Sequence, residues 1–173
     1  MELVTEALRL RTVTDGDIEE VARMWAFEKG TIPLEEAQAA INYMQNNHAQ
    51  NTAGHIVHLC FAVFEKNGGA IIGWCGLDGT TEGKLHIFYL LDAGYRNRGY
   101  ATQCAVRLLA YAFDEAHVPF VNGGCDKDNL ASRKVLEKAS MALCGYEENG
   151  DPLFIMDCEI YGKVKMPNAR GGR

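Results

Sequence analysis

An apolar strand that turns directly into an amphipathic helix is the feature that most limits how this chain can fold. Residues 85–91 read Leu-His-Ile-Phe-Tyr-Leu-Leu, an almost unbroken apolar run. Such a run is typical of a strand that is buried on both faces of a sheet. After a short polar segment, apolar side chains recur at helical spacing, at Ala101, Ala105, Leu108, Leu109 and Ala112. This pattern predicts a helix that packs on the sheet through one apolar stripe.

The turn between this strand and helix, residues 96–101, is suited to binding an anion. The first backbone N–H groups of a helix have no partner within the helix, and they point into the turn at the positive end of the helix dipole. Gly99 lets a ligand approach the backbone closely, and Ala101 keeps the next position small. Arg96 and Arg98 add positive charge, which favours a pyrophosphate over a single carboxylate. An ordinary exposed turn with two solvated arginines is the alternative interpretation.

Three motifs, in order along the chain, resemble those of the GNAT superfamily of acyl-CoA N-acyltransferases. The segment Y-L-L-D-A-G-Y-R-N-R-G-Y-A-T-Q at 89–103 contains R-x-x-G-x-A and resembles the acetyl-CoA signature of that family. It is most similar to the branch whose members acetylate ribosomal-protein N-termini. I-I-G-W-C-G-L at 71–77 resembles the family's v-I-G-x-x-x-L strand, and N-L-A-S-R-K-V-L-E-K at 129–138 resembles its N-x-x-S-x-x-V-L-E-K helix.

The resemblance implies that the strand and the turn bind acetyl-CoA, mainly through backbone groups. Tyr89, Leu90 and Leu91 would bond the pantetheine arm as if it were an added strand. Asn129 and Ser132 match the asparagine and serine of the family's late helix, and they would contact the pantetheine arm or the pocket wall. Helix capping explains Asn129 equally well. The residues implied for the pyrophosphate are Arg96, Asn97, Arg98, Gly99, Tyr100, Ala101 and Thr102.

Transfer of an acyl group from a thioester to an amine needs a neutral amine, a donor to the thioester oxygen and a proton for the departing thiolate. His86 is the candidate general base, because an unperturbed imidazole titrates near neutrality and many relatives carry glutamate on this strand. A half-exposed strand histidine without a catalytic role is the alternative. Glu28 is a further candidate for contacting the amine. Leu136 stands where many GNAT enzymes have a tyrosine general acid, so Tyr146 is a candidate substitute.

The order of predicted elements is β-α-α-β-β-β-α-β-α-β-β, which matches the GNAT topology. We therefore expect an α+β fold with a central mixed, mostly antiparallel sheet flanked by helices. Residues 1–161 are expected to form one domain. Residues 162–173 carry four basic side chains and no acidic one, and they are expected to be a disordered tail. The predicted strands are 8–13, 55–66, 70–77, 85–91, 119–125, 142–147 and 153–161.

Composition narrows the classes of partner. The formal net charge of −6 argues against a surface built to bind nucleic acid. Six cysteines are scattered without a C-x-x-C pair, so we expect reduced structural thiols and no metal site. No apolar run approaches the roughly 20 residues of a membrane helix, and no signal peptide is evident, so a cytoplasmic protein without a membrane partner is expected.

The resemblance predicts an N-acetyltransferase that moves an acetyl group from acetyl-CoA to a primary amine by direct attack. The acceptor would be a protein N-terminus or a small-molecule amine, and the enzyme a monomer or a homodimer. The alternative is a catalytically idle GNAT domain that binds CoA as a sensor or serves as an interaction module. A nicotinamide dehydrogenase is disfavoured, since no G-x-G-x-x-G opens a β-α-β unit.

Overall fold

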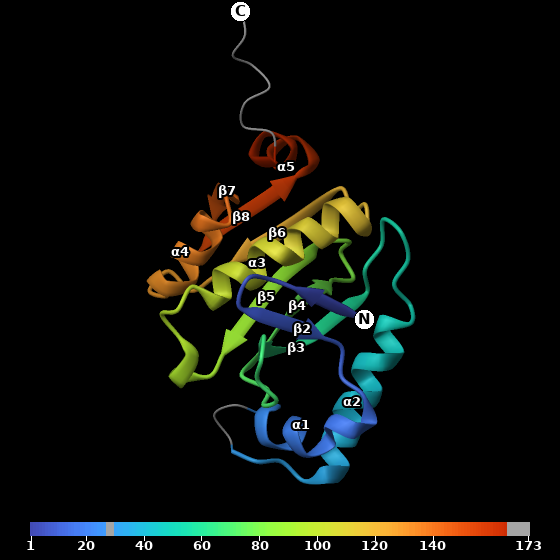
Figure 1. Cartoon of the computed structure of the whole chain (residues 1–173). Helices are drawn as coiled ribbons and strands as arrows, with labels where there is room; N and C mark the ends of the chain where they lie inside the picture. Colours follow the sequence, from blue (N-terminus) through green and yellow to red (C-terminus); the bar gives the residue numbers. More distant parts are fainter. Residues whose placement is uncertain (27–29, 166–173) are drawn as a thin grey trace, which may run out of the picture.

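The computed structural model describes residues 1–26 and 30–165, which form one eight-stranded sheet with helices packed on it (Figure 1). The strand order across the sheet is β1-β2-β3-β4-β5-β6-β8-β7. Neighbouring strands are antiparallel except β5 and β6, which are parallel. The predicted α+β fold with a mixed, mostly antiparallel sheet is confirmed.

The elements follow the predicted order, with one addition at each end of the chain. The strands are β1 (Glu2–Val4), β2 (Leu8–Arg11), β3 (His58–Glu65), β4 (Gly73–Gly79), β5 (Leu85–Leu91), β6 (Phe120–Gly124), β7 (Ala142–Tyr146) and β8 (Pro152–Asp157). The α-helices are α1 (Ile18–Met24), α2 (Leu34–His48), α3 (Tyr100–Ala110), α4 (Leu130–Lys138) and α5 (Cys158–Lys165). A π-helical turn at Tyr111–Glu115 extends α3. Strand β1 and helix α5 are the two additions.

Helix α5 corrects the prediction for the end of the chain. A strand was expected to reach residue 161 and a disordered tail to follow, whereas β8 ends at Asp157 and residues 158–165 are helical. The Asp157 carboxylate accepts a hydrogen bond of 2.8 Å from the backbone N–H of Ile160, which starts the helix. The Tyr161 hydroxyl then donates to Asp114 at 2.8 Å and ties α5 to the end of α3. The helix thus draws residues 162–165 out of the expected tail.

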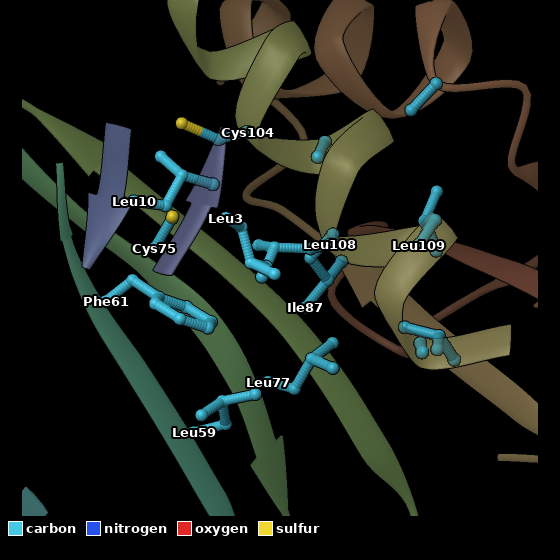
Figure 2. Close-up of a cluster of buried hydrophobic side chains, with 14 of the residues drawn as sticks. Leu3, Leu10, Leu59, Phe61, Cys75, Leu77, Ile87, Cys104, Leu108 and Leu109 are labelled. Atoms are coloured by element: carbon cyan, nitrogen blue, oxygen red, sulfur yellow. The ribbon is translucent and has the colours of Figure 1, made fainter. Parts of the chain in front are cut away.

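The side of the sheet covered by α3, here called the α3 face, holds the larger apolar core. Alternate residues of the central strands point to it, because side chains along a strand alternate between faces. Leu59, Phe61, Leu77 and Ile87 from β3, β4 and β5 gather there, and Leu108 of α3 packs with them in the same buried cluster (Figure 2). The predicted apolar stripe of the helix is therefore the part that seals this face.

The opposite side, here called the α2 face, holds a smaller core beneath α1 and α2. Cys60 and Phe64 of β3 and Trp74 of β4 pack there against Ile41 and Met44 of α2. The Trp74 indole N–H donates to the Met24 carbonyl oxygen at 2.9 Å, which fixes the end of α1 over the sheet. This core covers strands β3 and β4 and ends at β5.

Strand β5 is consequently buried on one face only, whereas the sequence predicted burial on both faces. Leu85, Ile87 and Leu91 are buried on the α3 face, but His86 is half-buried and Leu90 is 47% exposed on the other. An apolar run alone does not reveal how far the covering helices reach. The uncovered part of the α2 face is the part that needs a functional explanation.

Candidate functional site

Strands β5 and β6 pair at one position only, and this defines the site. His86 is the partner of Asn122, and no further ladder pair joins the two strands in the described chain. On its other edge β5 pairs with β4 over its whole length, from Leu85 to Leu91. Residues 88–91 therefore have an edge toward β6 without ladder partners, here called the open edge. Unpaired backbone groups need water or a ligand, and an extended ligand can bind such an edge as an added strand.

The predicted anion turn follows directly after the open edge. Gly99 is the N-cap of α3 and has a φ of 77°, so the helix begins at Tyr100, directly after the glycine. The Arg96 side chain donates from Nε to the Leu91 carbonyl oxygen at 3.0 Å, and Arg98 donates to the Gly94 carbonyl oxygen at 3.0 Å. Both arginines thus brace the turn, and they bring positive charge to the N-terminus of an 11-residue helix.

Glycine is required at position 99 by the backbone and not by neighbouring protein atoms. A side chain added there would find no heavy atom within 4 Å, but the left-handed φ disfavours any residue with a Cβ. Asn97 also has a left-handed φ, of 62°, which asparagine tolerates better than most residues. The turn is therefore held in a fixed shape, with free space beside Gly99.

Tyr89 joins the open edge to α4. Its hydroxyl lies 2.9 Å from the Ser132 hydroxyl and donates to the Ser132 carbonyl oxygen at 3.1 Å. Burial raises the pKa of Tyr89 to about 12, so the phenol keeps its proton at neutral pH. The Asn129 side chain accepts from the Ser132 N–H at 3.0 Å, which is the helix cap anticipated as its alternative role. The structure thus brings Tyr89, Asn129 and Ser132 together along one side of the open edge.

His86 lies at the point where β5 and β6 separate. The register between β4 and β5 is continuous, so no bulge turns the side chain from the face set by alternation. It shares the α2 face with Phe88 and Leu90 and is half-buried. This is the uncovered part of the sheet, so His86 is accessible to a molecule on that face. Its role as a base stays a prediction.

The other two predicted catalytic residues are not brought together with His86. Tyr146 lies on β7, which β6 and β8 separate from β5, and it is exposed beside Arg133 of α4. Glu28 falls outside the described residues. Leu136, at the position of the family tyrosine, is buried in the core of the α3 face.

Sequence reasoning missed a set of polar residues next to His86. Asp78 of β4 is the cross-strand partner of His86, and His58 of β3 is the partner of Asp78. The His58 Nδ1 atom lies 2.9 Å from the Asp78 Oδ1 atom. Only the register of two hairpins reveals this neighbourhood, because the three residues are widely spaced in the sequence.

Other kinds of site find no support in the described part of the chain. No group of three or more His, Cys, Asp or Glu residues there could hold a metal ion. Cys60, Cys75 and Cys104 are buried free thiols, and burial raises the pKa of Cys60 to about 12. None of the helices in residues 1–26 and 30–165 is both long and apolar enough to cross a membrane.

Comparison with known proteins identifies a family that matches most of the chain. Residues 7–142 match the model of the family described as "Acetyltransferase (GNAT) domain". The chain is 25% identical over 151 residues to "Uncharacterized N-acetyltransferase YjdG" of Bacillus subtilis (strain 168), covering 82% of this chain and 89% of that protein.

Solved structures show the same fold at low sequence identity. The ribosomal-protein-S5-alanine acetyltransferase of Vibrio fischeri superposes with a TM-score of 0.77 at 17% identity, over 91% of this chain and 96% of that one. RimL, a ribosomal L7/L12 alpha-N-protein acetyltransferase solved in complex with coenzyme A, superposes with a TM-score of 0.70 at 17% identity, over 91% and 98% of the two chains.

Proposed function

Because the chain belongs to the GNAT acetyltransferase family, we propose that it acetylates a primary amine that reaches the open edge of β5 from the α2 face. Membership makes the protein an acetyl-CoA-dependent N-acetyltransferase. The binding path of the cofactor, the catalytic group and the acceptor are the proposal. The observation that carries it is the single β5–β6 pair at His86, which leaves an edge for an extended ligand next to a turn suited to a pyrophosphate.

The charge of the turn and the unpaired edge of the strand support acetyl-CoA binding along this path. The open edge of residues 88–91 binds the pantetheine arm through backbone groups, as an added strand would. The first N–H groups of α3, together with Arg98, hold the pyrophosphate. Tyr89 and Ser132 form the wall on the side of α4. Bound acetyl-CoA supplies an acyl thioester that a neutral amine can attack.

The reach of the strand supports this path. A strand rises about 3.3 Å per residue, so the five steps from Leu91 back to His86 span roughly 17 Å. That length suits an extended pantetheine arm whose pyrophosphate lies on the turn. His86 is then the first titratable side chain beyond the open edge on the α2 face.

His86 is the group proposed to remove a proton from the amine. A lysine-like amine, with a pKa of about 10.4, is almost wholly protonated at neutral pH, and an α-amino group, at about 7.7–8.0, is more readily deprotonated. We therefore favour an α-amine, such as a peptide N-terminus, as the acceptor. The ribosomal-protein acetyltransferases among the structural neighbours support the same choice.

An acceptor screen tests this function. Release of CoA from acetyl-CoA is followed with an alanine-terminated tetrapeptide, with the same peptide blocked by N-acetylation, and with spermidine. The proposal expects turnover with the free peptide and none with the blocked one. Turnover with spermidine alone would move the acceptor to small polyamines. Binding of acetyl-CoA without turnover on any amine would favour the idle CoA-binding domain.

A further inference from the structure

Four polar side chains form a line across the α2 face at the end of the open edge. His58, Asp78, His86 and Asn122 lie on β3, β4, β5 and β6, and each is the cross-strand partner of the next. Cross-strand partners project from the same face of a sheet and have Cβ atoms about 4.5–5.5 Å apart. We call these four residues the polar row. It crosses the sheet at the level where β5 and β6 separate.

The first pair of the row is rigid at one end and open at the other. The His58 side chain is 13% exposed and that of Asp78 is 54% exposed, and Nδ1 and Oδ1 lie 2.9 Å apart. The His58 ring is flanked by Phe88, stacked at 6.0 Å, and by Tyr43 of α2 at 5.4 Å. The ring is therefore held by aromatic packing, and it in turn holds the carboxylate.

The hydrogen bonds of this pair leave it incomplete. Within residues 1–26 and 30–165, the Asp78 carboxylate is bonded to His58 alone, and the buried His58 Nε2 atom has no partner. Nδ1 of His58 is the donor in this bond, because an ionised carboxylate can only accept. The second carboxylate oxygen of Asp78 is available to a cation on the open face.

The α2 face is also the more accessible side of β5 for an acceptor. On the α3 face, Leu85, Ile87 and Leu91 of β5 are buried against the core beneath α3. On the α2 face, the covering core stops at Phe88, and Asp78 and His86 are not covered by it. Asp78 and His86 are therefore open to an acceptor that approaches the end of the open edge from the α2 face.

We propose that Asp78 binds the acceptor as its ammonium cation beside His86, and that His58 is a positioning residue that fixes the carboxylate. This rests on the proposed function, because it names the group that selects a charged amine for that reaction. The ammonium is held by the free oxygen of Asp78 and gives one proton to the imidazole of His86. The neutral nitrogen then attacks the thioester carbon, and the C–N bond forms as the C–S bond breaks. The departing thiolate takes up the second proton that the nitrogen loses, and His86 returns its proton to solvent.

Steady-state kinetics with two probes test this assignment. The probes are the alanine-terminated tetrapeptide and spermidine, each with acetyl-CoA. Asp78→Asn keeps the size of the side chain and removes its charge, and Glu82→Gln removes the charge of an exposed acid in the neighbouring β4–β5 turn. We expect Asp78→Asn to raise the acceptor KM about ten- to a hundredfold, the usual loss for a bond to a charged group. The KM for acetyl-CoA should stay within about twofold, and Glu82→Gln should change neither constant.

A second set of variants separates positioning from folding. His58→Phe removes the donor to Asp78 and keeps an aromatic ring between Tyr43 and Phe88, so it should raise the acceptor KM. His58→Asn offers an amide N–H near the place of Nδ1 and should restore much of the lost affinity. If His58→Phe and His58→Asn have equal KM values, His58 does not position the carboxylate.

Three results would count against the assignment of Asp78, each in a different way. If the wild-type protein acetylates a probe and Asp78→Asn leaves the KM of that probe unchanged, this assignment is wrong and the proposed function stands. If Asp78→Asn raises the KM of acetyl-CoA as much as that of the acceptor, Asp78 belongs to the cofactor site instead. If the wild-type protein acetylates neither probe, both proposals fail together.

Discussion

The two faces of the central sheet differ in how far the helices cover them. On the α3 face, helix α3 seals a continuous apolar core that reaches from β1 to β8. On the α2 face, the core ends at Phe88, and a row of polar residues continues across β5 to β6. The same strands supply both faces through alternation, so neighbouring residues such as His86 and Ile87 have different surroundings. The face to which a residue points tells more about its role than its place in the sequence.

The largest expected effect is on the α3 face. Leu108→Ala removes a fully buried side chain and should lower the free energy of unfolding by about 2–5 kcal/mol. Val106→Ala, at an exposed position of the same helix, should change it by less than about 0.5 kcal/mol. Urea unfolding measures both. Similar losses for the two variants would contradict the packing of α3 on the sheet through Leu108.

His86→Ala tests the α2 face and should alter catalysis in place of stability. We expect the turnover number to fall on the order of 10² while the affinity for acetyl-CoA is nearly unchanged. The acid limb of the pH–rate profile should move or vanish, because it would report this imidazole. His55→Ala, at an exposed position, is the control. Turnover within about threefold of wild type would show that His86 has no catalytic role.

Gly99→Val tests the turn between strand β5 and helix α3. The left-handed φ makes valine cost about 1–3 kcal/mol of stability, and the new side chain enters the free space beside the turn. We expect affinity for acetyl-CoA to fall about tenfold or more. Gly83→Val is a matched control, with a φ of 79°, equally free space and a place at the other end of β5. Calorimetry showing equal affinity losses in both variants would remove the turn from the cofactor site.

A smaller effect is expected on the pH dependence of stability, through the ion pair of Arg11 and Asp17 outside the site. Burial alone would raise the pKa of Asp17, but hydrogen bonds from Arg11 and Thr14 hold it below its ordinary value. A carboxyl with a lowered pKa in the folded state stabilises the fold above its unfolded pKa, near 3.9, and this is lost as the pH falls through the folded value. Asp17→Asn should therefore destabilise the protein at pH 7 and progressively less as the pH falls below the unfolded pKa, near 3.9. A constant difference across that range in thermal melts would contradict the assignment.

The sequence predicted the elements that rest on local patterns. The strand at 85–91, the turn at Gly99 and the cap at Asn129 each have a signal within a few residues, and the structure has each of them. The pairing of Asp78 with His58 and His86 depends on the register of three strands, which no local pattern contains. The extent of the cover over β5 depends on where α1 and α2 end. The cofactor side of the site was therefore accessible to sequence reasoning, and the acceptor side was not.

Amide hydrogen exchange of β5 with and without acetyl-CoA shows whether the cofactor binds along the open edge. The backbone of residues 88–91 lacks ladder partners on the β6 side, so amides that point there should exchange rapidly in the free protein. Binding of acetyl-CoA should protect residues 88–91 and 96–102 and leave β3, at 58–65, unchanged. Protection confined to other parts of the chain, with no change in β5, would show that acetyl-CoA does not bind along this strand.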